Sequence, residues 1–474
     1  MKRPTIVLVA VLFLSCFGLL LALAGACQND SCTKDTDCQM PLICVASACV
    51  PVGPKPDAAD DGDAEPEVDG DTPPRDGDGE ADEGGEATDD GDVPDELEVS
   101  DDGGGGCTLV TSLSYNIALT AADGDERPVT LPSEGEFATI IRLPGIVAAD
   151  GLRFQRFHLD GTAIPSAIWT LSSVEIGPSH PLVELPSGGF AVAFSIPEGL
   201  QTGIWMKITE RNGGGGTTPS QIPDTTASST APTLTFDGTD LVVAWVETNA
   251  GAVEIRGQHV NADTGVASGS YVTVAAGPSG TKEPRIVWGD IRHVLAYFNA
   301  SDGALHILSL DGTLTVTRDD PFVPASGQSF VGYPAVAWNG TEFGVAWETR
   351  GTSSSTMHLA TFLPDTLPVD HEPLAATVPL AGTEQGQLSL TWGGVRNEWA
   401  IAWRFSQVGR VRISLARIDA TDFRLVDVPI DLRTEATTGA HPGVAYNAGY
   451  YQVTWSEVFG TTYPLYEATH GCTP

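Results

Sequence analysis

The stretch YPAVAWNGTEFGVAW, Tyr333–Trp347, decides how this chain folds, because variants of it recur along the sequence. Successive copies are 50 to 54 residues apart, measured from the proline near the start of each copy. A fixed period in this range is typical of a repeat architecture, in which each repeat is one supersecondary unit. With leucine in place of proline in the sixth copy, the seven reference positions are Pro128, Pro181, Pro232, Pro284, Pro334, Leu388 and Pro442.

Each copy has the pattern of a strand, a tight turn and a second strand. The turn often carries Asn-Gly or Asp-Gly, as at Asn339–Gly340, and this pair is the strongest short-range signal for a β-hairpin. In the second strand, Phe343–Trp347, the large Phe, Val and Trp alternate with the small Gly and Ala. A strand that is apolar on both faces is buried on both. We therefore predict radially stacked sheets, each packing its large side chains on the small side chains of the next.

Two further strands follow in each unit, so the repeats predict an all-β fold, a seven-bladed β-propeller of four-stranded blades. The last unit has only three strands, which end in Leu465–Thr469. The segment Tyr115–Thr120 has the sequence pattern of a fourth strand and precedes the first unit. We predict that this N-terminal strand completes the final blade and closes the ring.

Two cysteines flank the predicted closure. Cys107 precedes the incoming strand, and Cys472 lies where other blades turn from their third to their fourth strand. We predict a Cys107–Cys472 disulfide that replaces the missing turn. It would close a loop of 472 − 107 = 365 residues, for which chain-entropy models give about 5 kcal/mol of stabilisation.

The first 26 residues have the organisation of a secretory signal peptide. Lys2 and Arg3 precede an apolar run, Ile6–Ala26, which ends in small residues before Cys27. The run is also long enough to span a membrane, so an uncleaved anchor is the alternative. The end of the run, Leu-Ala-Gly-Ala-Cys, resembles the lipobox of bacterial lipoproteins, although Ala24 stands where leucine is usual.

That resemblance implies that Cys27 carries lipid chains, palmitate among them, and that these chains attach the protein to a membrane. Gln28 follows the cysteine, and in Gram-negative lipoproteins a residue other than Asp there implies the outer membrane. Cysteine parity agrees with lipidation. Of eight cysteines, Cys16 leaves with the signal peptide, so a lipidated Cys27 leaves six for disulfides.

Residues 27–50 are predicted to form a small disulfide-rich module. About 18 residues cannot build a hydrophobic core, so two disulfides must hold this fold, and three pairings of the four cysteines are possible. A zinc site is the alternative, but the spacing lacks the C-x-x-C pairs that favour zinc. The module resembles the cysteine-rich knots of Gram-negative surface lipoproteins, and its cysteines are Cys32, Cys38, Cys44 and Cys49.

Residues 51–106 are predicted to be a disordered acidic linker. Asp57–Asp102 contains 22 acidic residues and one basic residue, Arg75, with almost no large apolar side chain. Such a segment cannot bury enough apolar surface to order itself and extends by self-repulsion. The remaining residues, 107–474, form the predicted propeller, with 37 acidic and 19 basic residues and a net charge of 19 − 37 = −18. This charge argues against binding to nucleic acid or anionic lipid.

Motifs of established catalytic chemistry are absent from the sequence. There is no HExxH, no G-x-S-x-G and no phosphate-binding loop. We therefore expect no cofactor and no metal, and we predict no catalytic residue. The repeat itself offers one candidate ligand site. If the first strand of each blade is innermost, the residues just before the seven reference positions form a ring at the mouth of the central channel. The polar residues of this ring are Arg127, His180, Glu283, Tyr333, Gln387 and His441.

The whole organisation resembles a Gram-negative bacterial surface lipoprotein, with a lipid anchor, a disulfide knot, an acidic stalk and a propeller. The leading hypothesis is a monomeric, non-enzymatic binding or adhesion module of the cell envelope, with a polysaccharide or an envelope protein as ligand. A carbohydrate-active hydrolase or lyase at the channel mouth is the second hypothesis. A convergent carboxylate pair, or an acid beside a tyrosine or histidine, would favour it. A structural subunit of an envelope complex is the third.

Overall fold

The computed structural model separates the chain into two units, Met1–Pro94 and Asp95–Pro474, and each is described here by itself. Within the described part of the chain, no helix has the length and apolar character needed to cross a bilayer. The predicted signal peptide and most of the acidic linker lie outside the described residues, which are 42–45, 48–51, 107–115, 128–146, 149–165, 168–170, 179–198, 201–222, 227–276, 283–352, 354–371, 374–379, 388–407, 410–427, 429–433, 441–456 and 465–472.

The described part of the first unit is a β-hairpin of β1 (Leu42–Val45) and β2 (Ala48–Pro51). Its antiparallel register places Cys44 opposite Cys49. Cys32 and Cys38 lie outside the described residues, so the pairing within this module stays a prediction.

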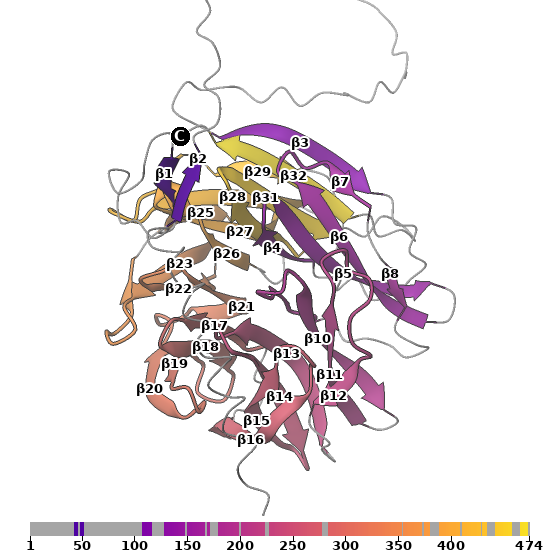
Figure 1. The fold of residues 1–474 in the computed structure, drawn as a ribbon. Helices are drawn as coiled ribbons and strands as arrows, with labels where there is room; N and C mark the ends of the chain where they lie inside the picture. The colour runs from indigo at the N-terminus through magenta and orange to yellow at the C-terminus, as the bar shows by residue number, and fades with distance from the viewer. Residues whose placement is uncertain are drawn as a thin grey trace, which may run out of the picture. The chain divides into compact units, whose positions relative to one another are not determined.

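The second unit is the predicted seven-bladed β-propeller. Figure 1 shows the sheets succeeding one another around a centre, in chain order. Blade 1 consists of β4 (Val129–Ser133), β5 (Glu136–Ile146), β6 (Ala149–His158) and β7 (Ala163–Ile164), with β8 (Ile168–Thr170) also paired to β6. Blade 2 consists of β9 (Leu182–Glu184), β10 (Phe190–Glu198), β11 (Gln201–Thr209) and β12 (Ser220–Ile222). Blade 3 consists of β13 (Ser228–Phe236), β14 (Asp240–Asn249), β15 (Ala252–Asn261) and β16 (Ala267–Ala276).

The next blades repeat this antiparallel order. Blade 4 consists of β17 (Arg285–Gly289), β18 (Arg292–Asn299), β19 (Ala304–Leu310) and β20 (Val316–Phe322). Blade 5 consists of β21 (Ser329–Trp338), β22 (Phe343–Arg350), β23 (Ser354–Phe362) and β24 (Val369–Asp370), with β25 (Leu374–Pro379) also paired to β23. Blade 6 consists of β26 (Leu388–Trp392), β27 (Glu398–Gln407), β28 (Arg410–Asp419) and β29 (Ile430–Arg433), with a short 3-10 helix η2 (Gly394–Arg396) between its first two strands.

Blade 7 confirms the predicted closure by an N-terminal strand. Its sheet runs β3 (Cys107–Tyr115), β32 (Leu465–Cys472), β31 (Tyr450–Ser456) and β30 (Gly443–Asn447). The start predicted for the incoming strand was wrong, because β3 begins at Cys107 rather than at Tyr115. The prediction copied the distance between strand and repeat from another blade, whereas the ladder with β32 sets the register here and pairs Cys107 with Cys472. Residues 116–120 lie outside the described part of the chain.

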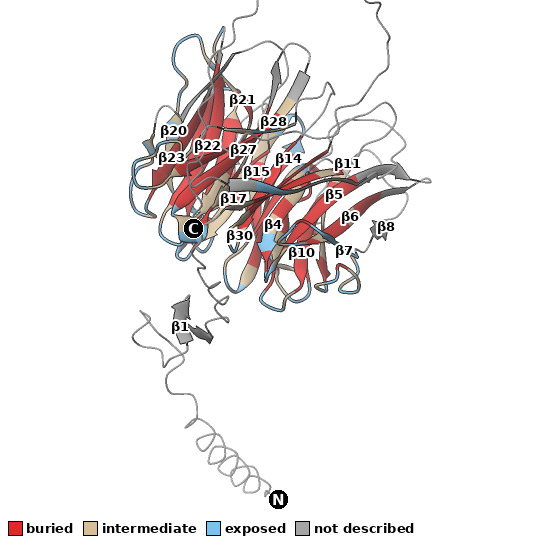
Figure 2. Cartoon of the chain, turned by 90° about the horizontal axis from the view of Figure 1, so that it is seen from above, coloured by how far each residue is buried: buried red, intermediate tan, exposed pale blue. Residues whose placement is uncertain are grey.

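The blades pack as the alternation of large and small side chains predicts. Phe343, Val345 and Trp347 of β22 form one buried cluster with Val294 and Ala296 of the preceding blade. The same arrangement recurs where the aromatic side chains of β27 pack on Ala346, and where those of β31 pack on Ala400 and Ala402. Figure 2 shows buried residues concentrated in the middle strands of the blades. The core is therefore a series of interfaces between neighbouring sheets rather than one central cluster.

We expect Gly344→Ala to destabilise the propeller by about 1–3 kcal/mol, the usual range for overpacking a core. A Cβ on Gly344 would lie 2.8 Å from the Trp399 ring of the next blade. Because Trp399 is fully buried, its indole cannot move aside without disturbing its own blade. Chemical denaturation measures the effect. Gly340→Ala, in the open hairpin turn of the same blade, serves as a comparison without steric contact, although its φ of +95° adds backbone strain.

Candidate functional site

The central cavity of the propeller is lined by the first strand of every blade. Its volume is about 230 Å³. Residues from β4, β9, β13, β17, β21, β26 and β30 all contribute to the lining. These innermost strands have one edge without a strand partner in their own sheet. A proline near the start of such a strand costs little, because an edge strand leaves backbone donors outside the ladder.

Three of the six residues predicted for the channel mouth line this cavity: His180, Tyr333 and His441. His180 and His441 come from blades 2 and 7 and are only 1% and 6% exposed. Glu283 is buried and is not among the lining residues. Arg127 and Gln387 lie outside the described residues, so their placement stays a prediction.

The residues that follow the seven reference positions were not among the predicted site residues. All seven of these residues line the cavity. Side chains two positions apart point to the same face of a strand, so the residues before and after the reference position share one face. This period could have identified the second set from the sequence: Val129, Leu182, Thr233, Arg285, Ala335, Ser389 and Gly443.

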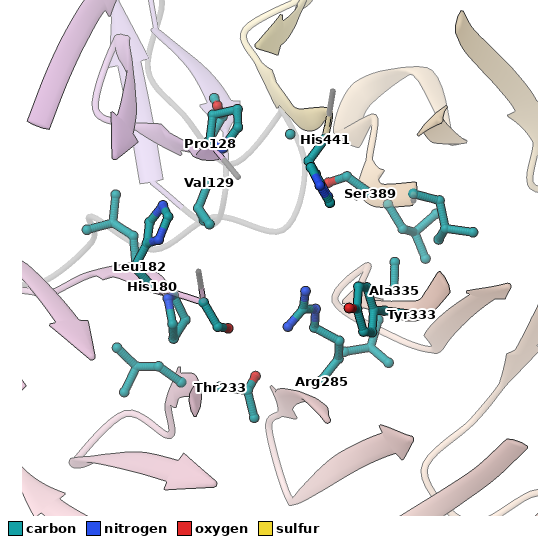
Figure 3. A pocket seen from close by; sticks show the side chains of 18 of the residues that line it. Pro128, Val129, His180, Leu182, Thr233, Arg285, Tyr333, Ala335, Ser389 and His441 are labelled. Atoms are coloured by element: carbon teal, nitrogen blue, oxygen red, sulfur yellow. The ribbon is translucent and has the colours of Figure 1, made fainter. Parts of the chain in front are cut away.

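Arg285 brings a positive charge to the cavity, and its guanidinium is held in place by two neighbours. Its Nη2 lies 3.1 Å from Oε2 of Glu283, two residues earlier in the chain. Its Cζ lies 5.8 Å from the ring centroid of Tyr333 in the next blade, at cation–π distance. In Figure 3, Arg285, His180 and His441 surround the same opening from three different blades.

Several hydroxyl groups around the cavity have structural partners in the neighbouring blade. Ser179 Oγ donates to the carbonyl of Pro232 at 3.0 Å, and Thr233 Oγ1 accepts from the backbone N–H of Ile286 at 3.1 Å. Ser389 Oγ accepts in the same way from Val444 N–H at 3.2 Å. These bonds connect the innermost segments of neighbouring blades, which share no ladder. The charged or ionisable side chains among the described lining residues are Arg285, His180, His441 and Tyr333.

These groups suit an anionic ligand. An arginine recognises a carboxylate or phosphate through directed, charge-assisted hydrogen bonds. Histidine and tyrosine can donate hydrogen bonds and can also take part in proton transfer. Among the described residues that line the cavity, none is Asp or Glu. A hydrolase with two carboxylates in this cavity therefore has no support in the described residues.

An acid beside a tyrosine does occur, but inside the interface of blades 6 and 7. Tyr451 Oη donates to Oε1 of Glu398 at 2.7 Å, and Arg417 Nη1 lies 3.3 Å from the same oxygen. Burial is the main cause of the raised pKa of Tyr451, and the Glu398 carboxylate beside it raises the pKa further. All three side chains are almost fully buried, so this cluster joins two blades and is closed to a polymer. Within the described residues, no group of three or more His, Cys, Asp or Glu is placed to hold a metal ion.

No family model and no curated protein matches this sequence. Solved structures with a similar fold include the polysaccharide lyase Uly1, with 10% identity over 76% of this chain and 92% of that chain and a TM-score of 0.43. A subtype N10 neuraminidase-like protein of A/little yellow-shouldered bat/Guatemala/060/2010 has 9% identity over 77% of this chain and 100% of that chain and a TM-score of 0.43. The endosialidase of phage phi92 has 10% identity over 75% and 69% and a TM-score of 0.44. At these identities the similarity extends to the fold alone.

Proposed function

We propose that this propeller is a carbohydrate-active protein that takes the uronate unit of an acidic polysaccharide into its central cavity and cleaves the chain by elimination. The observation that supports this most is the chemistry of the lining. An oriented guanidinium, two imidazoles and a phenol share one small cavity, and none of the described lining residues is acidic. The proposal follows the second of the three functional hypotheses, in its lyase form.

Each group has a place in the reaction. Arg285 pairs with the carboxylate of the uronate, which makes the proton on the adjacent ring carbon easier to remove. A base, His180 or His441, takes that proton as the bond between the next ring carbon and the linking oxygen breaks. A carbon–carbon double bond forms in the ring, and the departing oxygen receives a proton from Tyr333 or from the other histidine.

We expect Arg285→Met to weaken binding of a uronate polysaccharide by about 10- to 100-fold, since a hydrogen bond to a charged group contributes about 1.5–3 kcal/mol. Binding is measured by titration with polygalacturonate or a glucuronate polymer, and cleavage by the ultraviolet absorbance of the unsaturated product. Arg292→Met is the matched control. Arg292 begins β18 in the same blade and pairs with Gly289 at the end of β17, far from Arg285 at its start. Its side chain is buried to a similar extent and forms an ion pair with Asp365.

The outcome that contradicts the proposal is an Arg285→Met variant that binds and cleaves as the wild type does. Loss of both activities in Arg292→Met as well would mean that the effect comes from the fold of blade 4 rather than from the cavity. His180→Ala and His441→Ala complete the set, because a base or acid of the reaction affects cleavage more strongly than binding.

Binding without cleavage is the second candidate function, and the size of the cavity favours it. A volume of about 230 Å³ is below the usual range of roughly 300–1,000 Å³ for pockets that enclose a small-molecule ligand. Such a cavity admits one sugar unit or the end of a chain rather than a run of units. Retention on the same polymers with no unsaturated product would select this function. Retention only of envelope proteins would select a structural subunit of an envelope complex.

The placement of the propeller at a membrane is a separate proposal that rests on the sequence alone. We propose that Cys27 is lipidated and holds the protein in the outer membrane, with residues 51–106 as a spacer. Mass spectrometry of the mature N-terminus tests this directly. An acylated peptide beginning at Cys27 is the expected result, whereas a peptide that retains Ile6–Ala26 would replace it with an uncleaved anchor.

A further inference from the structure

A second, larger cavity lies outside the central one, between blades 4 and 5. Its volume is about 460 Å³, within the usual range for small-molecule sites. The turn between β18 and β19 and the connection from β20 to β21 form most of its lining. Neither of these segments contributes to the central cavity.

One wall of this outer cavity is apolar. Phe298 and Phe330 stack with their ring centroids 4.8 Å apart and their planes at 15°. Phe298 is buried, while Phe330 is only partly buried, and both line the cavity. At the rim, the side chain of Val323 is 74% exposed. An apolar ring beside open space suits a ligand with one apolar face.

The other wall carries a carboxylate that is fixed in position. Oδ2 of Asp302 accepts from Asn299 Nδ2 and from His306 Nε2, both at 2.9 Å. Oδ1 accepts from the backbone N–H of Ala304 at 2.9 Å. His306 is itself held by Asp319, which lies 2.9 Å from its Nδ1. Because a carboxylate has about four acceptor positions, Asp302 can accept one further hydrogen bond.

The charge state of this wall is set by the same contacts. Partial burial acts to raise the pKa of Asp302, but the hydrogen bonds from His306 and from the Ala304 N–H lower it overall. Burial opposes protonation of His306, and the two aspartates outweigh it and raise the pKa of this histidine. Asp302 is therefore ionised at neutral pH and acts only as an acceptor. It favours hydroxyl donors and repels a second carboxylate.

Both cavities are lined by residues at the same end of the strands in blade 4. Arg285, at the start of β17, pairs with Ala296, so the end of β18 at Asn299 lies at the end of the blade where the Arg285 side chain enters the central cavity. Phe330 of β21 lines the outer cavity, and Tyr333 of the same strand lines the central one. Three residues of a strand span on the order of 10 Å, a distance that a short run of sugar units covers.

We propose that the outer cavity is a remote subsite for a neutral sugar unit of the same acidic polysaccharide whose uronate occupies the central cavity. The apolar face of the sugar packs on Phe330, and a hydroxyl group donates to Asp302. This inference rests on the proposed function, and it specifies the substrate as a heteropolysaccharide in which uronate and neutral sugars alternate within a few units.

The test uses size-fractionated oligosaccharides in which glucuronate alternates with a neutral hexose, titrated against the full protein. Val323→Trp fills the rim of the outer cavity from an exposed position, so the fold is left intact. We expect it to weaken binding of the long oligosaccharides about tenfold, which corresponds to about 1.4 kcal/mol, and to leave a disaccharide unaffected. Phe330→Leu, which removes the ring but keeps an apolar side chain, has the same expected pattern.

Val395→Trp is the matched control, because Val395 is 89% exposed in η2, at the opposite end of the strands. Wild-type affinity in Val323→Trp at every chain length overturns the remote subsite and leaves the proposed function standing. Equal weakening at every length, disaccharide included, also overturns it. If Arg285→Met binds normally while Val323→Trp does not, the central function fails and the outer cavity is a sugar site in its own right. If the wild type binds none of these oligosaccharides, both proposals fail.

Discussion

Replacement of Glu467 with glutamine is expected to stabilise the propeller at pH 8 by up to about 5 kcal/mol and to have little effect below pH 4.5. Glu467 lies on β32 of the closing blade and is fully buried. Its Oε1 accepts hydrogen bonds from Gln452 and from Thr469. Burial, which outweighs these two bonds, raises the pKa of Glu467 to about 8, and Asp160 of blade 1 adds to the shift.

The direction of the pH dependence follows from the two states. An unfolded Glu467 loses its proton near its ordinary pKa of 4.5, whereas the folded one keeps it up to about pH 8. Between these values the folded state holds the additional proton, so the stability of the wild type falls as pH rises. Glutamine has nearly the same shape and carries no charge at any pH. The stability of the variant should therefore not fall with pH through this group. For a domain of this size, its melting temperature at pH 8 should be on the order of 5 °C higher than that of the wild type.

Thermal unfolding of both proteins between pH 4 and pH 8 measures the effect. Glu134→Gln is the control, because the Glu134 side chain is 90% exposed and its substitution removes the same formal charge. Its melting temperature should follow that of the wild type throughout. Parallel curves for the wild type and Glu467→Gln would mean that Glu467 is ionised inside the interface between blades 7 and 1.

The blade architecture could be predicted from the sequence because it depends on local patterns. Each interface between sheets places large side chains on small ones, and that requirement is written into every second strand of the repeat. No local sequence pattern encodes the register between two strands that are far apart in the chain. The strand Cys107–Tyr115 was placed too late because its position depends on the ladder with β32, more than 350 residues away in the chain.

The candidate site was only partly predictable for a related reason. The residues before the reference prolines were chosen as a ring, and His180, Tyr333 and His441 do line one cavity. Arg285 was missed although the period of a strand places it on the same face. Glu283 was included, but its carboxylate pairs with Arg285 instead of lining the cavity. The outer cavity could not be anticipated, because it is formed by a turn and a connection from two different blades.

The predicted Cys107–Cys472 disulfide stays a prediction, and the backbone register of the closing blade is compatible with it. The antiparallel register pairs Cys107 directly with Cys472. Residues directly opposite in such a pair have Cα atoms about 4.5–5.5 Å apart, within the usual range of about 4.4–6.8 Å for disulfides. These two residues are the first of β3 and the last of β32, so one bond would fix both ends of the ring.

Loss of this bond is expected to destabilise the propeller by about 5 kcal/mol, since the loop it closes spans most of the domain. For a domain of this size the melting temperature should fall by on the order of 5–8 °C. Cys107→Ser with Cys472→Ser removes the bond and leaves the N-terminal cysteines as an internal comparison. Reductant should lower the melting temperature of the wild type to that of the double variant and leave the variant unchanged. Equal melting temperatures for the two oxidised proteins, with both thiols of the wild type open to alkylation, would show that the ring closes by strand pairing alone.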